Sequence, residues 1–375
     1  MIHWKQLDEW QKDWLNVDVD ALKKRREFLR RAPLRDQALF VDSLQVVRQG
    51  RRELMKDFAA IYAHQTGLDS AIASTPHMDR LLELAERHRD GGSPDPRRWF
   101  EALSLFDQAL AIARIEYKDP LESVGRDLEV LLDFLWSTFF DDEYKRIHLH
   151  AYHDPTKQFI VTEDDVSIDE PLIRPGLIHR VYPLDCRRIT SGGIAFMDDR
   201  IKGAFSTWLK IGRKMKDGIV TDTYNVTDRC GLTFVVPTRA DLVEFALSLL
   251  DTLLKNGAEE LEKLSEAGED VAADPTNRSS SSMYRMAKML VMWHEREYEF
   301  QFITFHDYFT AKRSLTDANH DLYKLRQACG FSFPYLWPTS IYGIEWEQEH
   351  VRNDLRAWKI DQLGWHVNGK HSVNL

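Results

Sequence analysis

The stretch R-I-K-G-A-F-S-T-W-L-K-I-G-R-K, residues 200–214, decides how the chain is organised. Its apolar residues recur at spacings of one, three and four positions, which predicts a helix with one buried face. These apolar residues are Ile201, Ala204, Phe205, Trp208, Leu209 and Ile211. The opposite face carries Arg200, Lys202, Ser206, Lys210, Arg213 and Lys214. Such a face suits a polyphosphate, because guanidinium and ammonium groups bind anionic oxygens, although a solvated basic face has the same composition.

Composition excludes several classes of protein. The 375 residues carry 50 Lys+Arg against 60 Asp+Glu, a formal net charge of −10, so no overall basic field favours long duplex nucleic acid. Cys186, Cys230 and Cys329 are too few and too widely spaced for a disulfide framework or a zinc site. The charged N-terminal stretch does not read as a signal peptide, and no apolar run is long enough for a membrane span. These features predict a cytoplasmic protein without membrane contact.

Residues 1–145 read as successive amphipathic helices and predict a helical bundle with a regulatory or oligomerisation role. Such a bundle would serve a homo-oligomer or a regulatory partner. We expect Trp99, Trp136, Phe139 and Phe140 in its core. The predicted helices are Leu7–Leu15, Val19–Arg31, Leu34–His64, Met78–His88, Arg97–Tyr117 and Leu121–Phe140.

From residue 146 the pattern changes to short β-branched or alternating segments separated by Pro-containing breaks, which predicts strands. The predicted strands are Ile147–Tyr152, Gln158–Thr162, Leu177–Tyr182, Gly192–Met197, Gly231–Pro237, Met283–Val291 and Tyr298–Phe305. Helices are expected at Ala240–Lys255 and Phe309–Ala328. The sequence thus predicts an α+β protein with a helical domain (1–145), a mixed α/β domain (146–330) and a Trp-rich C-terminal extension (331–375) that packs back onto the body.

Two further segments have weaker signals. His148, His150 and His153 have the spacing of a strand face, but no acidic or Cys partner lies at a telling distance, so a surface strand is favoured over a metal site. Residues 256–282 are acidic, poor in apolar residues and end in serines, which predicts a mobile surface segment.

An ordered set of polar motifs follows the basic stretch. It runs Arg200-x-Lys202-x-x-x-Ser206-x-x-x-Lys210, then Asp228 ahead of an apolar strand, Tyr284, Glu299-x-Gln301-x-x-Thr304 and His320-x-x-Tyr323-Lys324. In this order the set resembles the synthetase domain of the RelA/SpoT alarmone synthetases, over roughly residues 190–328. The resemblance implies a nucleotidyltransferase-like mixed β-sheet flanked by helices.

By the same resemblance, the domain would transfer the β,γ-pyrophosphate of ATP to the 3′-hydroxyl of a purine nucleotide, making an alarmone of the ppGpp or ppApp type. Asp228 and Glu299 would be the catalytic pair and the Mg²⁺ ligands. Tyr284, Lys288 and Gln301 would bind the acceptor (GTP, GDP or an adenine nucleotide), and His320 and Lys324 would approach the phosphates. The donor ATP would be held by Arg200, Lys202, Ser206, Lys210, Arg213 and Lys214.

The chain also departs from the family pattern. Ile303 and Thr233 stand where the family has or often has Arg, Lys288 stands where it usually has His, and the Gly before Tyr284 is missing. Arg278 and Arg285 are candidate substitutes for the missing cations. Two alternatives therefore stay open: pyrophosphorylation of the 3′ end of tRNA, as in toxin-like members, and an inactive nucleotide-binding protein. No hydrolase motif is seen in residues 1–145, so no alarmone-degrading activity is expected.

Overall fold

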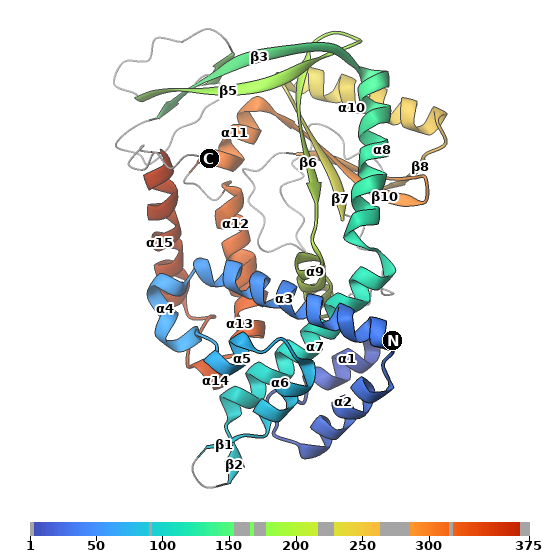
Figure 1. The fold of residues 1–375 in the computed structure, drawn as a ribbon. Coiled ribbons are helices and arrows are strands. Elements are labelled where there is room, and N and C mark those ends of the chain that lie inside the picture. Colours follow the sequence, from blue (N-terminus) through green and yellow to red (C-terminus); the bar gives the residue numbers. More distant parts are fainter. Residues whose placement is uncertain are drawn as a thin grey trace. The chain divides into compact units, whose positions relative to one another are not determined.

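The computed structural model describes residues 4–89, 92–153, 166–168, 178–216, 229–262, 286–314 and 318–367. Its internal contacts divide the chain into two compact units (Figure 1). Unit 1 comprises Met1–Leu121, Gly203–Val226 and Ala328–Leu355, and unit 2 comprises Glu122–Lys202, Thr227–Gln327 and Arg356–Leu375. The predicted α+β class is confirmed, with N-terminal helices followed by a mixed sheet and its flanking helices.

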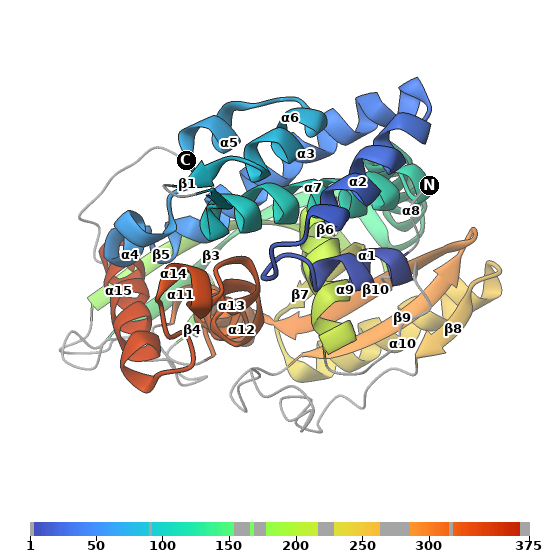
Figure 2. The ribbon, with the colours of Figure 1, turned by 90° about the horizontal axis from the view of Figure 1, so that it is seen from below.

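Unit 1 is almost entirely helical, and its helices pack around α7 (Figure 2). Its first helices are α1 (Trp4–Gln11), α2 (Val19–Arg31), α3 (Leu34–Lys56), α4 (Ala59–Thr66), α5 (Ser70–Ser74), α6 (Met78–Ala85) and α7 (Pro96–Lys118). A two-stranded hairpin, β1 (His88–Arg89) and β2 (Ser93–Pro94), precedes α7. The unit also contains α9 (Ala204–Lys216), the π-helical turn η3 (Ala328–Ser332), α13 (Phe333–Leu336) and α14 (Thr339–Tyr342).

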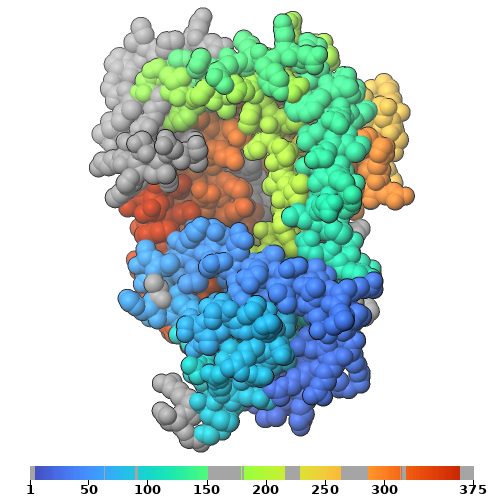
Figure 3. Space-filling model, in the orientation of Figure 1, coloured from blue at the N-terminus to red at the C-terminus, as the bar shows by residue number. Residues whose placement is uncertain are grey.

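Helix α7 is the core of unit 1. Asp95 caps its N-terminus by accepting from the backbone of Arg97, and Pro96 occupies the first turn, where a missing N–H costs nothing. Every residue from Trp99 to Ile115 is buried, because α7 contacts α1, α3, α6 and α9. The space-filling view shows the side chains of the N-terminal helices closed over one another (Figure 3).

The predicted helix Leu34–His64 is wrong in one respect, because it is broken at Asp57 and Phe58. The break lets Phe58 enter an aromatic cluster, with ring centroids 4.7, 5.0 and 5.3 Å from those of Phe333, Trp337 and Trp346. Trp337 and Trp346 are fully buried there, which confirms that this part of the C-terminal extension packs onto the body. Helix α15 (Glu349–Val367) follows; it starts in unit 1 and continues into unit 2.

Unit 2 is built on an eight-stranded mixed sheet with the order β4-β3-β5-β6-β7-β10-β9-β8. Strands β7 and β10 pair in parallel, and the other described pairs of this sheet are antiparallel. The strands are β3 (Phe140–His153), β4 (Val166–Ile168), β5 (Ile178–Ile189), β6 (Ile194–Ile201), β7 (Cys230–Val236), β8 (Glu259–Glu262), β9 (Ala287–Trp293) and β10 (Arg296–Thr304).

Helices cover both faces of this sheet. On one face, α8 (Leu121–Phe139) and α10 (Arg239–Lys255) pack onto alternate residues of the central strands, such as Phe234 and Phe302. On the other face, α11 (Phe305–Arg313) packs onto Val235 and Ile303. Helix α12 (His320–Gln327) follows α11 and contacts it.

The domain boundary predicted near residue 145 differs from the boundary between the two units, which lies between Leu121 and Glu122. The reason is that helix α8 packs onto the sheet of unit 2. Its buried face, Val124 to Phe139, lies in the core that also contains the strands. Of the four aromatic residues expected in the N-terminal core, Trp99 is buried in unit 1, whereas Phe139 and Phe140 are buried in unit 2. Trp136 is partly buried against the same core as these two phenylalanines.

Several predicted elements need correction. The helix predicted at Phe309–Ala328 is two helices, α11 and α12, and strand β8 lies inside the segment predicted to be mobile. The rest of that segment, residues 263–282, and the predicted strand Gln158–Thr162 lie outside the described residues. The three cysteines are buried. In the described part of the chain, no helix has the length and apolar character needed to cross a bilayer.

We predict opposite effects of alanine at two helical glycines. A Cβ at Gly50 of α3 would overlap the ring of Phe205 on α9, whereas a Cβ at Gly125 of α8 would lie 4.0 Å from its nearest neighbour, Ile201. Gly125→Ala should therefore gain about 0.5–1 kcal/mol of stability from helix propensity. Gly50→Ala should lose about 1–3 kcal/mol through overpacking. Thermal denaturation followed by circular dichroism measures both, and a gain for Gly50→Ala would contradict the close α3–α9 packing.

Candidate functional site

The sequence-predicted residues that the structure brings together lie on one face of the unit 2 sheet. Along β10, Tyr298, Phe300 and Phe302 point into the core under α8 and α10. Because successive side chains of a strand alternate between faces, Glu299 and Gln301 lie on the opposite face, followed by Ile303 under α11. The alternation predicted for β10 is thus confirmed.

The strand register aligns two rows of residues across this face. Arg200 of β6 pairs with Gly231 of β7, which pairs with Glu299 of β10. One row further along, Asp198, Thr233, Gln301 and Lys288 are aligned across β6, β7, β10 and β9. Residues that are distant in the sequence therefore form one polar strip, which ends where the apolar residues under α11 begin.

The carboxylate of Glu299 is the centre of this strip. Arg200 Nη2 donates to Glu299 Oε1 at 3.0 Å, and Gln301 Nε2 donates to the same oxygen at 2.5 Å. The side chain of Glu299 is only 13% exposed, so these two hydrogen bonds compensate a carboxylate that is largely removed from water. Within the described residues, no donor is bonded to the second oxygen, Oε2.

Arg200 reaches Glu299 by passing over Gly231 on the intervening strand. A Cβ at Gly231 would lie 3.2 Å from Arg200 Nη2 and 3.4 Å from the backbone oxygen of Glu299. The absence of a side chain at this position therefore leaves the guanidinium its path across β7. The role of Gly231 was not predicted from the sequence, because the need for glycine arises only when β6, β7 and β10 are placed side by side.

The electrostatic surroundings keep Glu299 ionised. Burial is the strongest influence and raises the pKa of the Glu299 carboxyl. The charges of Arg200 and Lys202, the hydrogen bond from Gln301 and the charge of Lys288 together outweigh burial, so that the net pKa lies below its ordinary value. Lys288 Nζ also lies 3.2 Å from Glu262 Oε2 on β8, which holds this lysine at the edge of the strip.

His320 and Lys324, expected near the phosphates, lie on α12 of the same unit. Burial, followed by the charges of Lys324 and Lys312, lowers the pKa of His320 to about 4, and Arg200 contributes in the same direction. His320 is therefore neutral at pH 7 in a cationic environment. Lys312 Nζ lies 3.8 Å from Asp198 Oδ2, which ties α11 to the polar strip. No motif in the sequence pointed to Lys312 or Asp198.

The structure divides the basic stretch of residues 200–214 between a strand, a loop and a helix, so the prediction of one helix over these residues is wrong. Arg200 and Ile201 end strand β6, because both pair with β7, and Lys202 N donates to Arg229 O at 2.8 Å. Helix α9 begins only at Ala204, and it buries Phe205, Trp208 and Ile211 as predicted. Arg200 and Lys202 are therefore presented by the end of a strand and by a loop, respectively.

The remaining donor-binding candidates, Ser206, Lys210, Arg213 and Lys214, lie on α9 and belong to unit 1. Ser206 is exposed, and the three cations are half-buried. The structure assembles the polar strip from residues of unit 2 alone, so a shared site with α9 stays a prediction. Asp228, Tyr284, Arg278 and Arg285 lie outside the described residues.

No group of three or more His, Cys, Asp or Glu side chains that could hold a metal ion occurs in the described ranges. His150 Nδ1 lies 2.8 Å from His179 Nε2, and these two histidines alone do not make such a group. In these ranges the polar strip contains two carboxylates: Glu299, whose Oε2 accepts no hydrogen bond, and Asp198, whose Oδ2 lies 3.8 Å from Lys312 Nζ.

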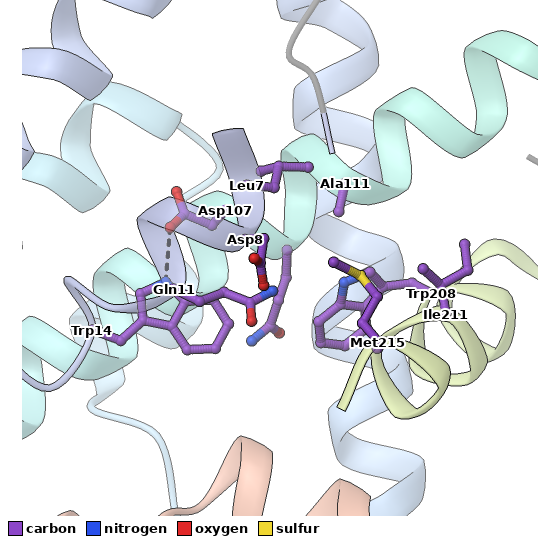
Figure 4. A pocket seen from close by; sticks show the side chains of 11 residues that line it. Leu7, Asp8, Gln11, Trp14, Asp107, Ala111, Trp208, Ile211 and Met215 are labelled. Carbon is purple, nitrogen blue, oxygen red and sulfur yellow. Dashed lines mark hydrogen bonds between the residues drawn. The ribbon is translucent and has the colours of Figure 1, made fainter. Parts of the chain in front are cut away.

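A small pocket in unit 1 does not compete with the polar strip as a nucleotide site (Figure 4). Trp14, Asp107 and Trp208 are among its lining residues, and Trp14 Nε1 donates to Asp107 Oδ2 at 2.7 Å. Its volume of about 10 Å³ is that of roughly one water molecule. The pocket therefore has no room for a nucleotide.

Comparison with known proteins adds no assignment. No protein-family model matches the chain, and no curated protein matches its sequence.

We predict that the Arg200–Glu299 contact depends on Gly231. Gly231→Ala should displace the guanidinium and raise the pKa of Glu299, and Arg200→Met should raise it further, because each change weakens a favourable charge next to the carboxylate. Side-chain ¹³C NMR titration of labelled glutamate measures the pKa directly. An unchanged Glu299 titration in Arg200→Met would contradict the described pair.

We also predict that unit 2 loses stability in mild acid through His320. The pKa of His320 is about 4 in the folded protein against 6.5 for the ordinary side chain, so the unfolded chain binds more protons between these values. Stability should therefore fall as the pH falls from about 7 to 4, by up to about 3 kcal/mol from this residue. In His320→Asn, thermal denaturation should show a shallower pH dependence, whereas the exposed control His64→Asn should keep the full dependence.

Proposed function

We propose that the chain is an ATP-dependent pyrophosphokinase that transfers the β,γ-pyrophosphate of ATP to the 3′-hydroxyl of a purine nucleotide, with unit 2 as the catalytic part. The observation that carries the proposal is the Glu299 carboxylate, which is held at one oxygen by Arg200 and Gln301 and is surrounded by cations. The motif order that resembles alarmone synthetases supplies the reaction class.

The proposed reaction requires a group that accepts a proton and cations that bind phosphates, and the polar strip contains both kinds of group. The acceptor O–H bond breaks, a bond forms between the acceptor oxygen and the β-phosphorus, and the bond from that phosphorus to the oxygen of AMP breaks. Because the lowered pKa keeps Glu299 ionised, its Oε2 is suited to take the acceptor proton. Arg200 and Lys202 would stabilise negative charge on the phosphates; the Arg200 side chain is 40% exposed and so has donors to spare.

Mg²⁺ fits this arrangement as a partner of the substrate. In phosphate-transfer sites this ion is held by one or two carboxylates together with substrate phosphates and water. As the alternative to taking the acceptor proton, Glu299 Oε2 would provide one such oxygen among the described residues, and Asp228 is our candidate for the other carboxylate. When bound, the ion would neutralise charge on the triphosphate. Gln301 and Lys288, aligned on β10 and β9, would face the acceptor.

We predict that Glu299→Gln lowers pyrophosphate transfer by at least about 100-fold, because an amide can neither accept the proton nor balance the cations. Transfer of label from [γ-³²P]ATP to GTP, GDP, adenine nucleotides and deacylated tRNA, resolved by chromatography, measures it. Asp185→Asn is the matched control. Asp185 of β5 also accepts a hydrogen bond from an arginine of another strand, Arg146 of the neighbouring β3, at 2.7 Å, but this pair lies on an exposed surface.

Two results would contradict the proposal. One is that the wild-type chain labels no acceptor of the panel. The other is that Glu299→Gln and Asp185→Asn retain the same activity. Label that appears only on tRNA would keep the transfer chemistry and replace the acceptor.

A further inference from the structure

Gln301 is bonded on both sides within the polar strip. Its Nε2 donates to Glu299 Oε1 at 2.5 Å, and its Oε1 accepts from the hydroxyl of Thr233 on the neighbouring strand at 3.3 Å. Thr233 and Gln301 are register partners on β7 and β10, and the Thr233 side chain is half-buried. The three side chains thus form a continuous chain of hydrogen bonds along one face of the sheet.

The chemistry of the three groups gives this chain a direction. An ionised carboxylate only accepts hydrogen bonds, so the amide must turn its NH₂ group toward Glu299. The amide oxygen then faces Thr233, whose hydroxyl must donate its proton there. Reversing the amide would place two oxygens against each other. The carboxylate therefore sets which way the amide is turned, and the Thr233 hydroxyl holds the amide in that orientation by donating to its oxygen.

We propose that Thr233 and Gln301 are positioning residues that fix the rotation of the Glu299 carboxylate so that Oε2 is the oxygen presented to the substrate. This inference rests on the proposed pyrophosphokinase function. Both hydrogen bonds to Glu299, from Arg200 and from Gln301, end on Oε1. Two directed contacts to one oxygen restrict rotation of the carboxylate about its Cγ–Cδ bond, and they leave the lone pairs of Oε2 for the acceptor proton.

Two fully buried carboxylates of unit 1 are bonded differently from Glu299. Asp107 of α7 is bonded at both oxygens, by Arg25 Nε at 2.9 Å, Arg25 Nη2 at 2.6 Å and Trp14 Nε1 at 2.7 Å. Glu101 is also bonded at both, by Arg97 Nε and by the backbone of Asp69. In these two carboxylates every oxygen is used for structure, whereas Glu299 is held at one oxygen only.

The test compares Thr233→Val, which keeps the shape of the side chain and removes the hydroxyl, with Thr233→Ser, which keeps the hydroxyl. We expect Thr233→Val to lower kcat about fivefold to tenfold, the effect of one hydrogen bond, without a change of KM for ATP. The acidic limb of the pH–rate profile should move to higher pH, because the hydrogen bond that lowers the pKa of Glu299 is weakened. Thr233→Ser should restore most of the rate and the wild-type profile.

A second readout does not need activity. In side-chain ¹³C NMR titrations, the pKa of Glu299 should rise in Thr233→Val and return toward its wild-type position in Thr233→Ser. Thr190→Val is the matched control, since the Thr190 hydroxyl donates to the backbone oxygen of Phe139 at 3.2 Å, outside the polar strip, and its loss should leave the Glu299 titration unchanged.

The outcomes separate the two proposals. If the wild-type chain transfers no pyrophosphate but the Glu299 titration responds to Thr233→Val, the function fails and the hydrogen-bond chain stands. If transfer is observed and Thr233→Val leaves both kcat and the titration unchanged, or if valine and serine have equal effects, the positioning inference is overturned while the function stands.

Discussion

The polar strip of unit 2 depends on one ion pair, formed between residues 99 positions apart, in which Arg200 reaches over Gly231 to Glu299. A carboxylate that is largely buried must be compensated by hydrogen bonds and opposite charge, or it takes up a proton. Arg200 supplies both. The contact also constrains the sheet, because it requires β6, β7 and β10 to be adjacent and in one register.

Buried carboxylates are bonded differently in the two units, and this difference bears on the proposed function. In unit 1, Arg25 of α2 is enclosed and paired with Asp107 of α7, so that this contact joins two helices of the core. A buried pair of this kind costs desolvation and contributes mainly to which packing is adopted. In unit 2, Glu299 keeps one oxygen outside its contacts. A carboxylate that is held in place but not saturated combines a fixed position with capacity for chemistry.

Much of the secondary structure could be predicted from local sequence. Helix α2 has the bounds predicted for it, because an amphipathic pattern ends ahead of Pro33 and the residues at its start cap it. Strand β7 and helix α10 were placed to within a residue, since an apolar run and a capping Thr–Asp pair are local signals. The break at Asp57 and Phe58 was not predictable, because its reason is an aromatic cluster with residues from the far end of the chain.

For the candidate site, too, one part could be predicted from the sequence and another could not. Glu299, Gln301, Arg200 and His320 were selected as candidates from motif order, because residue types that suit phosphate chemistry are visible in one dimension. Their arrangement was not, and the prediction that Arg200 belongs to the helix of residues 200–214 was wrong because strand pairing with β7 overrides local helix periodicity.

By itself, therefore, the sequence determined the α+β class and the faces of the elements, since these follow from composition and periodicity, and its motif order supplied the candidate polar residues. Only the tertiary structure decided that Gly231 leaves a path for Arg200, that Thr233 donates to Gln301 and that one oxygen of Glu299 is left unbonded. The physical reason is that hydrogen bonds and ion pairs depend on distances of a few ångströms across neighbouring strands, and spacing along the chain does not encode those distances.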